Sequence, residues 1–381
     1  MKILAVDHSV LDPLGRSLYR ILSEQFHLEI RLLTPSRWFN NYQLLSQVEP
    51  QTSGNLPVFP SKMFLPSRTH RMVYLDLPGH VHTFKPDLLY VNSEPENYQT
   101  CHAAYTLRHS RNTKLVFSTW RNIDHRAIGY PYKMGFLNDI AERYVLAHAD
   151  HGVAFNEKAG SIFRELGYPK ITMIPPDLDI TVFRRRERRE LREKYGLRKF
   201  TVGFAGRLAN QKGIPDLFRA SALLAFEYQI LIVGVGPMRD RLVALSKELK
   251  IADRIVWMHP VRRYDMPPIL SAMDVLVLPS RTGRLWKEQF GRVLIEAMAC
   301  EVPVVGSDSG EIPVVVGKEG LIFHEGEPAA LASALTTLYE NAALRSSLAA
   351  KGLQKIKSTY AVEKVAPQYA ELFRSLMDSV E

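Results

Sequence analysis

Two glutamates, Glu288 and Glu296, lie eight residues apart in segment 286–299 and are the leading candidates for chemistry. Glu288 falls where a loop is expected to meet a helix, and Glu296 falls two turns inside that helix. Between them, the backbone N–H groups of Phe290 and Gly291 lie at the expected helix start, where an anion is favoured. An anion held there would have a carboxylate on each side that could bind hydroxyl groups. A nucleotide-sugar has this layout, with a ribose, a diphosphate and a second sugar.

Each carboxylate also has an ordinary structural interpretation. A glutamate in the first turn of a helix commonly complements the helix dipole, and Glu296 could pair with Arg292 across one turn. This interpretation is favoured for either glutamate alone. The combination of both glutamates with Gly291 and the apolar strand before them favours ligand binding instead.

Arg207 and Lys212 supply two cations near the end of another expected strand, Thr201–Ala205. They lie in a loop that begins at Gly206 and ends at Gly213. Two cations at the carboxyl end of a strand would neutralise a diphosphate, and would stabilise its charge as a leaving group without a metal ion. The alternative is a pair of exposed loop cations between structural glycines. The glutamate pair in the same half of the chain favours phosphate binding.

Strands and helices alternate through the second half of the chain, which is typical of a parallel sheet covered on both faces. The expected strands there are 201–205, 229–233, 255–258, 275–278, 302–305 and 321–323, and the expected helices are 214–224, 238–249, 266–272 and 290–299. The first half repeats this pattern less regularly, and segment 34–86 allows no assignment. Its expected strands are 3–6, 27–33, 88–91, 115–118, 152–154 and 171–174, with a helix over 15–23.

This alternation predicts an α/β protein of two doubly wound domains, 1–180 and 181–360, with a boundary within 175–184. Ligands in such sheets bind beyond the carboxyl ends of the strands, so two domains facing each other would form a cleft. Val261 follows the third expected strand of the second half, and its backbone could contact a nucleotide base. The turn 234–237 is expected to line the same cleft, but it lacks the third glycine of a dinucleotide-binding fingerprint.

The composition is that of a globular protein, with 46% hydrophobic and 23% charged residues among 381. No apolar run reaches the ~18 residues that span a bilayer, and the start of the chain, which reaches Asp7 and His8 early, is unlike a signal peptide. Cys101 and Cys300 have no metal-ligand spacing, so free thiols in a reducing compartment are expected. We therefore expect a cytoplasmic protein.

The net charge of +9 is concentrated in segment 184–199, where nine basic residues accompany three glutamates. Such a segment could attract an anionic membrane or a polyanion, while the favoured alternative is a solvated helix with ion pairs along its surface. Nucleic acid is disfavoured as a partner because only one aromatic residue, Tyr195, lies among the basic ones. A second candidate for contact with anionic lipid, at the cytoplasmic face of a membrane, is segment 59–71 with Phe64, Leu65, Arg68 and Arg71.

The chain resembles the retaining GT-B glycosyltransferases of family 4 in the motifs of their donor site. The motifs here are Gly206-Arg207, Lys212-Gly213, 288–291 and Glu296-Ala297, and the match continues through 279–281, 300–305 and 309–310. The resemblance is strongest over about 200–320. It implies two Rossmann-like domains and a last helix, about 361–381, that crosses back to the first domain.

By this resemblance, Arg207, Lys212 and Glu288 would act in catalysis, the two cations on the donor phosphates and the glutamate on the hydroxyls of the transferred sugar. The other donor-binding residues would be Phe290 and Gly291 through their backbone N–H groups, Glu296 through the ribose hydroxyls, Val261, and Gly15 in the first loop.

The first domain departs from the family pattern. Its first loop keeps one glycine, Gly15, of a usually glycine-rich segment, and Trp120 or Arg121 stands where many members have a histidine. A subset of the family with Asn-Ile at that place and acids after an earlier strand is more similar. The acceptor-side candidates are accordingly Glu94, Glu96, Arg121 and Asn122. The alternative, an acid cluster at a helix entry beside a polar loop, is about as well supported.

The resemblance implies transfer of a hexosyl-type group from a nucleoside-diphosphate sugar to a hydroxyl of a glycan, lipid or small molecule, with retention of configuration. No metal and no further cofactor are expected, since Asp7, Asp12 and Asp124 form no recognisable metal-binding pair. Two alternatives of other kinds remain. One is a nucleotide-sugar epimerase on the same fold, and the other is a non-catalytic subunit that binds a sugar nucleotide. The sugar, the base, the acceptor and the oligomeric state are left open.

Overall fold

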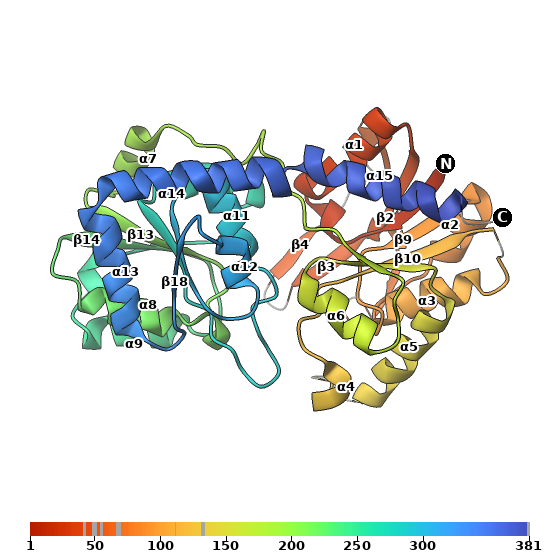
Figure 1. Ribbon diagram of the computed structural model, residues 1–381, viewed down its shortest axis with the longest axis horizontal. Helices are drawn as coiled ribbons and strands as arrows, with labels where there is room; N and C mark the ends of the chain where they lie inside the picture. Colours follow the sequence, from red (N-terminus) through yellow and green to blue (C-terminus); the bar gives the residue numbers. More distant parts are fainter. Residues whose placement is uncertain are drawn as a thin grey trace. The chain divides into compact units, whose positions relative to one another are not determined.

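The computed structural model describes residues 1–40, 43–47, 52–53, 56–65, 70–110, 112–130 and 134–378. It consists of two compact units (Figure 1). Unit 1 comprises Met1–Asp177 and Val362–Glu381, and unit 2 comprises Leu178–Ala361. Both units are Rossmann-like α/β domains built on a largely parallel sheet, which confirms the predicted fold class.

Unit 2 contains a six-stranded parallel sheet in the order β15-β14-β13-β16-β17-β18. Its four central strands are almost wholly buried, as expected of a sheet that helices cover on both faces. From β13 the chain adds β14 and β15 toward one edge of the sheet, and then crosses back to place β16 on the other side of β13. The point between β13 and β16, where the strand order reverses, is a topological switch point, and ligands bind at such points. The strands are β13 (Phe200–Ala205), β14 (Tyr228–Val233), β15 (Ile255–Met258), β16 (Val275–Leu278), β17 (Val304–Ser307) and β18 (Leu321–Phe323).

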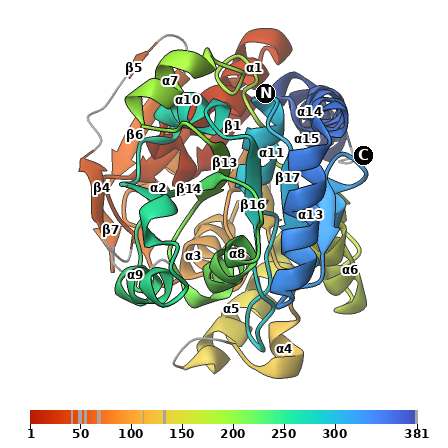
Figure 2. The same ribbon diagram turned by 90° about the vertical axis from the view of Figure 1, so that its left-hand side faces the viewer.

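The helices of unit 2 form two groups. Helix α8 packs against α9 and α13, whereas α11 packs against α10, α12 and α14. Figure 2 shows α8 and α9 below the strands and α10 and α11 above them. The helices are α7 (Arg188–Lys194), α8 (Ile214–Ala222), α9 (Arg239–Glu248), α10 (Met266–Ser271), α11 (Arg292–Ala299), α12 (Ile312–Val316), α13 (Pro328–Glu340) and α14 (Ala342–Lys355).

Unit 1 contains an eight-stranded sheet in the order β12-β11-β10-β9-β1-β2-β6-β5. The pairing of β5 with β6 is antiparallel, and the other pairings are parallel. A second switch point lies between β1 and β9. The strands are β1 (Lys2–Val6), β2 (Glu29–Pro35), β5 (Thr52–Ser53), β6 (Leu56–Ser61), β9 (Leu88–Val91), β10 (Lys114–Thr119), β11 (His151–Ala154) and β12 (Ile171–Met173), with hairpins of β3 (Arg37–Asn40) and β4 (Gln43–Gln47), and of β7 (Met63–Phe64) and β8 (Val73–Tyr74).

Unit 1 has a hydrophobic core on each face of its sheet, because successive strand residues point to opposite sides. From β1, Ile3 and Ala5 enter one core and Leu4 and Val6 enter the other. The first core includes α1 and α15, which lie side by side although they come from opposite ends of the chain (Figure 1). The helices are α1 (Ser17–Phe26), α2 (Leu77–Phe84), α3 (Tyr98–Leu107), α4 (His125–Ile128), α5 (Gly135–His148), α6 (Glu157–Glu165) and α15 (Val362–Asp378).

Several expected boundaries were wrong by two residues, including those of the strand expected over 27–33, which is β2 (Glu29–Pro35). The helix expected from residue 290 begins at Arg292, because Gly291 adopts a left-handed φ of +82° that a helix does not continue through. The helix expected from residue 15 begins at Ser17, after two short 3₁₀ turns over Ser9–Leu11 and Pro13–Arg16. The strand expected over 302–305 is β17, which starts two residues later.

Candidate functional site

The loops that follow β13 and β16 are packed together at the switch point of unit 2. Gly213 has a φ of +63°, and a Cβ added there would collide with the carbonyl oxygen of Pro279. The N–H of Arg281 donates to the carbonyl of Gln211 at 2.8 Å, which fastens one loop to the other. Glycine at position 213 is therefore required by both its backbone conformation and this close approach.

Lys212 and Glu288 meet at this junction. The Lys212 ammonium lies 2.5 Å from Oε2 of Glu288, and the Ser280 hydroxyl donates to the same oxygen at 2.6 Å. The Lys212 ammonium also lies 5.2 Å from the centroid of the Trp286 ring. The structure thus brings together two of the three residues predicted to act in catalysis. It places them at the carboxyl edge of the sheet, where a ligand is expected.

The backbone of Glu288 is held from a third loop, which follows β17. The N–H of Glu311 donates to the carbonyl of Glu288 at 3.0 Å. Gly310 has a φ of +58°, and a Cβ added there would collide with that carbonyl. The position of Glu288 therefore depends on loops from three different strands, two of which come later in the chain than Lys212.

Helix α11 carries the second glutamate of the motif. Gly291 is its N-cap, and Phe290, just before it, has a buried side chain with its ring centroid 5.6 Å from that of Tyr360. Glu296 is buried on α11, and its Oε1 accepts from Nε of Arg263 at 2.8 Å. The partner of Glu296 is thus an arginine from the 3₁₀ turn Arg263–Asp265, on another loop.

The other predicted donor-binding residues of unit 2 lie on neighbouring loops of the same edge. Arg207 is exposed in the loop directly after β13, and Val261 is half-buried in the loop after β15. Because β13, β14 and β15 are adjacent, the carboxyl ends of β13 and β15 lie on one side of the switch point. Cations and carboxylates on loops around a switch point could hold a diphosphate that carries hydroxyl groups at both ends.

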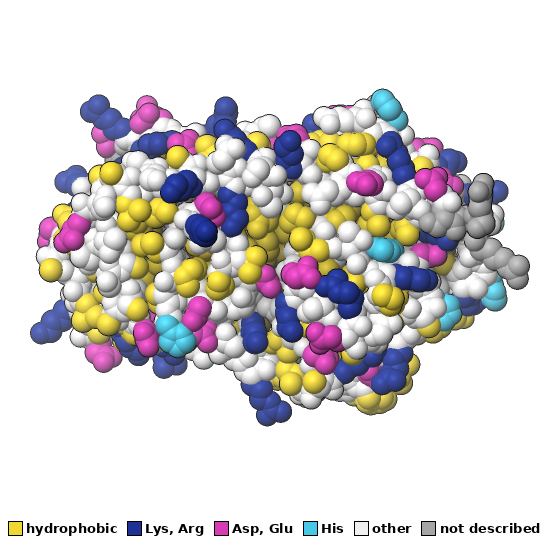
Figure 3. Space-filling model, in the orientation of Figure 1, with side chains coloured by type: hydrophobic (Ala, Val, Ile, Leu, Met, Phe, Trp, Pro, Cys, Tyr) yellow, Lys and Arg dark blue, Asp and Glu magenta, His cyan; other side chains and the backbone are white. Residues whose placement is uncertain are grey.

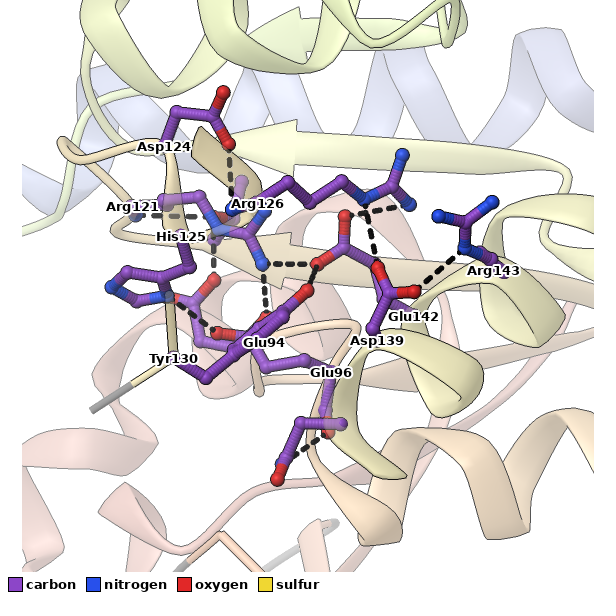
Figure 4. A network of polar contacts seen from close by, with 12 residues as sticks. Glu94, Glu96, Arg121, Asp124, His125, Arg126, Tyr130, Asp139, Glu142 and Arg143 are labelled. Atoms are coloured by element: carbon purple, nitrogen blue, oxygen red, sulfur yellow. Dashed lines mark hydrogen bonds and ion pairs between the residues drawn. The ribbon is translucent and has the colours of Figure 1, made fainter. Parts of the chain in front are cut away.

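The acceptor-side candidates lie at the carboxyl edge of unit 1, and three of them belong to one polar cluster (Figure 4). Arg121 is 2% exposed, and its Nη2 lies 2.6 Å from a carboxylate oxygen of Glu96 and 2.5 Å from one of Glu142. Asn122, the fourth candidate, is buried beside Arg121 in the chain. Arg121 and Glu96 therefore form a buried ion-pair network.

Further residues complete this cluster on its α4 and α5 side. The Tyr130 hydroxyl donates to Glu142 at 2.6 Å, and Arg126 lies 3.0 Å from Glu142 and 3.3 Å from Asp139. His125 lies 3.5 Å from Glu96. Figure 4 shows these side chains converging on the carboxylates of Glu96 and Glu142.

Glu94 and Glu96 titrate in opposite directions. Burial, together with the nearby charge of Glu96, raises the pKa of Glu94 to about 8. Burial opposes ionisation of Glu96 as well, but the Arg121 guanidinium overcomes this and lowers the pKa of Glu96 to about 2. Glu94 accepts from the Thr119 hydroxyl and from the Trp120 N–H, both at 2.6 Å. Two neighbouring carboxyl groups whose environments separate their pKa values are a frequent feature of catalytic and ligand sites.

Gly15 has a packing role in the first loop. A Cβ added at Gly15 would collide with the backbone of Ser9 in the preceding 3₁₀ turn. These turns pack closely after Asp7, the residue that follows β1. Asp7 accepts from the Tyr19 hydroxyl at 2.7 Å and from Asn92 at 2.9 Å. Gly15 thus lies beside the switch point of unit 1, in a position that tolerates no larger residue.

Several residues of these clusters were not identified from the sequence. Glu142 and Tyr130 belong to no recognisable motif, and the polar loop that contains Arg263 has no distinguishing sequence pattern. Asp216 is fully buried and accepts a two-pronged contact from Arg281, which ties α8 to the loop after β16. Only the three-dimensional fold brings these partners together. For Asp216, the one available signal was its position three residues after Gly213.

The basic segment 184–199 is largely engaged within unit 2. Arg188 and Arg192 pair with Asp274 at 2.7 and 2.9 Å, and Arg185 lies 3.4 Å from Glu301. Figure 3 shows basic and acidic side chains interspersed where α7 lies. In segment 59–71, Phe64 and Leu65 are exposed, while Arg68 lies outside the described residues.

Two features are absent from the described ranges. No helix within them is long and apolar enough to cross a bilayer. No group of three or more His, Cys, Asp or Glu side chains among the same residues is arranged to hold a metal ion.

Residues 187–355, which lie within unit 2, match the family model described as Glycosyl transferases group 1. A relative, the D-inositol 3-phosphate glycosyltransferase of Mycolicibacterium gilvum (strain PYR-GCK), is 31% identical over 251 residues, which make up 62% of this chain and 52% of the relative. The chain thus spans about half the length of that relative.

Solved structures share the fold over the whole chain. Sucrose-phosphate synthase from Thermosynechococcus elongatus gives a TM-score of 0.77 at 20% identity, with 100% of both chains covered. Anabaena HepE in complex with UDP-glucose gives a TM-score of 0.75 at 21% identity, covering 98% of this chain and 100% of the other. These similarities establish the GT-B fold for this chain.

Proposed function

We propose that the protein is a retaining glycosyltransferase that moves a sugar from a nucleoside-diphosphate sugar to a hydroxyl group of an acceptor, without a metal ion. The observation that carries this proposal is the contact of Lys212 with Glu288 at the switch point of unit 2. The group 1 domain over 187–355 supports it, as do the glycosyltransferase relatives and the complex of HepE with UDP-glucose.

The donor contacts follow from the loops of unit 2. Lys212 and Arg207 bind the diphosphate, and the N–H groups around Gly291 at the start of α11 add partial positive charge. Glu288 accepts hydrogen bonds from hydroxyls of the transferred sugar, and Glu296 accepts from the ribose. Lys212 and Glu288 would separate slightly to admit the donor, each exchanging part of its ion pair for a bond to the ligand.

The reaction breaks the bond between the sugar C1 and the diphosphate oxygen and forms a bond from C1 to the acceptor oxygen on the same face. The electron pair of the broken bond stays with the diphosphate. Lys212 and Arg207 stabilise this charge as it develops, which is where fixed cations contribute most to rate. The acceptor proton passes to the departing phosphate oxygen, so no separate general base is needed.

We assign the acceptor to the carboxyl edge of unit 1, near Glu94 and Asn122. Arg121 pairs with both Glu96 and Glu142, so Arg121 and Glu96 act on the acceptor through the shape and charge of the loops that they hold. Glu94, with its raised pKa, can offer a proton to an acceptor oxygen or receive one near pH 8. Its position after β9 places it at the unit 1 switch point.

One experiment tests the donor and the reaction together. The full chain is screened by thermal shift against UDP-, GDP- and ADP-sugars, since a ligand that binds the folded state raises the melting temperature. A donor that stabilises is then incubated with hydroxyl acceptors in EDTA, and NMR reports the anomeric configuration of the product. A retained configuration in EDTA supports the proposal. Inversion, a requirement for metal, conversion of the donor sugar without an acceptor, or stabilisation without turnover would each overturn a stated part of it.

A further inference from the structure

Arg263 binds one of the two carboxylate oxygens of Glu296, the residue that the proposed function assigns to the ribose. Its Nε lies 2.8 Å from Oε1 of Glu296. The Glu296 side chain is 8% exposed and the Arg263 side chain is 25% exposed, so this contact is shielded from solvent to a degree that surface ion pairs are not. Within the described part of the chain, every hydrogen bond to this carboxylate goes to Oε1, and Oε2 accepts none.

The guanidinium of Arg263 is itself held in place. Its central carbon lies 5.4 Å from the centroid of the Phe183 ring, and Phe183 is 1% exposed. Contacts with a buried ring and with a carboxylate together restrict the movement of the guanidinium. Because the contact to Glu296 is made through Nε alone, it fixes the carboxylate by one oxygen.

We propose that Arg263 is a positioning residue for nucleotide recognition, which holds Glu296 so that Oε2 accepts from a ribose hydroxyl of the donor. This inference rests on the proposed function, because it assigns Glu296 to the ribose. The arginine removes the rotational freedom that Glu296 would otherwise lose on binding, and preorganisation of this kind increases affinity. It also makes the site selective for ribose over deoxyribose, since a nucleotide without the hydroxyl would cover Oε2 and leave it unpaired.

The chain offers a matched control next to Arg263. Arg262 has a side chain that is 84% exposed and pairs with Asp265 at 2.8 Å within its own turn. Among the described contacts of the chain, Arg262 makes none with Glu296. Replacing Arg262 removes the same charge from the same loop without touching the carboxylate, so it separates the general effect of positive charge on a nucleotide from the specific positioning of Glu296.

The test measures binding of UDP, GDP and ADP, and of their 2′-deoxy and 3′-deoxy forms, by isothermal titration calorimetry. The chains compared are the wild type, Arg263→Gln, Arg263→Lys and Arg262→Ala. The quantity of interest is the ratio of the dissociation constants of the deoxy and ribose forms of one nucleotide. A hydrogen bond to a charged group corresponds to a wild-type ratio of about tenfold or more. We expect Arg263→Gln to reduce this ratio to below about threefold, Arg263→Lys to retain an intermediate ratio, and Arg262→Ala to keep the wild-type ratio.

The outcomes separate this inference from the function on which it rests. If no nucleoside diphosphate binds the wild type, the proposed function fails and the inference fails with it. If the wild type binds and discriminates, but Arg263→Gln weakens ribose and deoxyribose forms equally, Arg263 acts on the phosphates or on the fold, and only the inference is overturned. An unchanged ratio in Arg263→Gln has the same consequence. Circular dichroism and the melting temperature of each variant show whether a loss of binding reflects unfolding.

Discussion

The ammonium of Lys212 and the carboxylate of Glu288 are in contact at 2.5 Å although 76 residues separate them in the chain. They meet because β13 and β16 are neighbours in the sheet, and the loops that follow these strands lie against each other. The ammonium is therefore placed before any ligand arrives. An ion pair of this kind holds a cation ready for a developing negative charge at low cost in reorganisation.

Replacing Lys212 should affect turnover more than binding. If the charge that it meets develops mainly in the transition state, Lys212→Ala should lower kcat by about 10²–10³-fold and raise the dissociation constant of the donor less than tenfold. Steady-state kinetics and calorimetry with the donor found by thermal shift provide the two numbers. Lys247→Ala, at an exposed position of α9, should change neither. Equal and mild losses in kcat and affinity would show that the phosphates bind elsewhere.

Removing the Arg121 guanidinium should destabilise unit 1. Arg121→Met leaves the carboxylates of Glu96 and Glu142 buried without their common cation, and the loss of one partner from a buried pair costs about 3–5 kcal/mol. The measurement is urea unfolding followed by fluorescence. Arg143→Ala is the control. Arg143 is largely exposed, and it pairs with Asp139 one turn away on the same helix, α5. A similar small effect for both variants would mean that the cluster is not a structural element of the fold.

Glu94 and Glu96 should make the free energy of unfolding depend on pH in opposite directions. Glu94 has a pKa of about 8 when folded, against 4.5 for an unperturbed glutamate, so between these values the folded chain holds a proton that the unfolded chain has lost. The free energy of unfolding must then fall as the pH rises through this window. For Glu96, with a pKa of about 2, the contribution to stability is present above pH 4.5 and is lost as the pH falls towards 2.

Urea unfolding of the wild type and of Glu94→Gln at pH values from 5.5 to 8.5 checks the first signature. The variant cannot titrate at this position, so its stability should decline less over that range than the stability of the wild type. Parallel curves for the two chains would contradict the raised pKa of Glu94.

Gly310 should tolerate no side chain. Gly310→Ala introduces a Cβ at a φ of +58° and against the carbonyl of Glu288, so it should lower the free energy of unfolding by more than about 1 kcal/mol and weaken donor binding as Glu288 moves. Thermal unfolding with and without the donor measures both effects. The control is Gly79→Ala in α2, where no heavy atom lies within 4 Å of the added Cβ, and this change should be neutral or slightly stabilising. An unchanged donor affinity in Gly310→Ala would show that the loop after β17 does not position Glu288 for the donor.

The pattern of apolar residues in the sequence predicted strands whose bounds depend on neighbouring residues alone. The strands over 88–91 and 275–278 are fully buried, and they begin and end where the apolar runs do, because buried parallel strands consist of such runs. The start of α11 was misplaced, because Gly291 adopts a left-handed conformation and shifts the boundary by two positions. The contacts of Arg263 and Glu142 could not be foreseen. Each is made by a charged residue in a segment of ordinary polarity, and its partner is supplied by a distant part of the chain.

The last helix gives the chain an unusual folding order. Tyr369 and Phe373 of α15 belong to the same hydrophobic core as Ile3 of β1 and Tyr90 of β9. During synthesis, residues 1–177 emerge before unit 2, but their core lacks α15 until unit 2 has been made. Unit 2 is continuous in sequence, whereas unit 1 is interrupted by it. We therefore expect unit 1 to complete its core after unit 2 has been made, and its apolar surface to stay exposed until then.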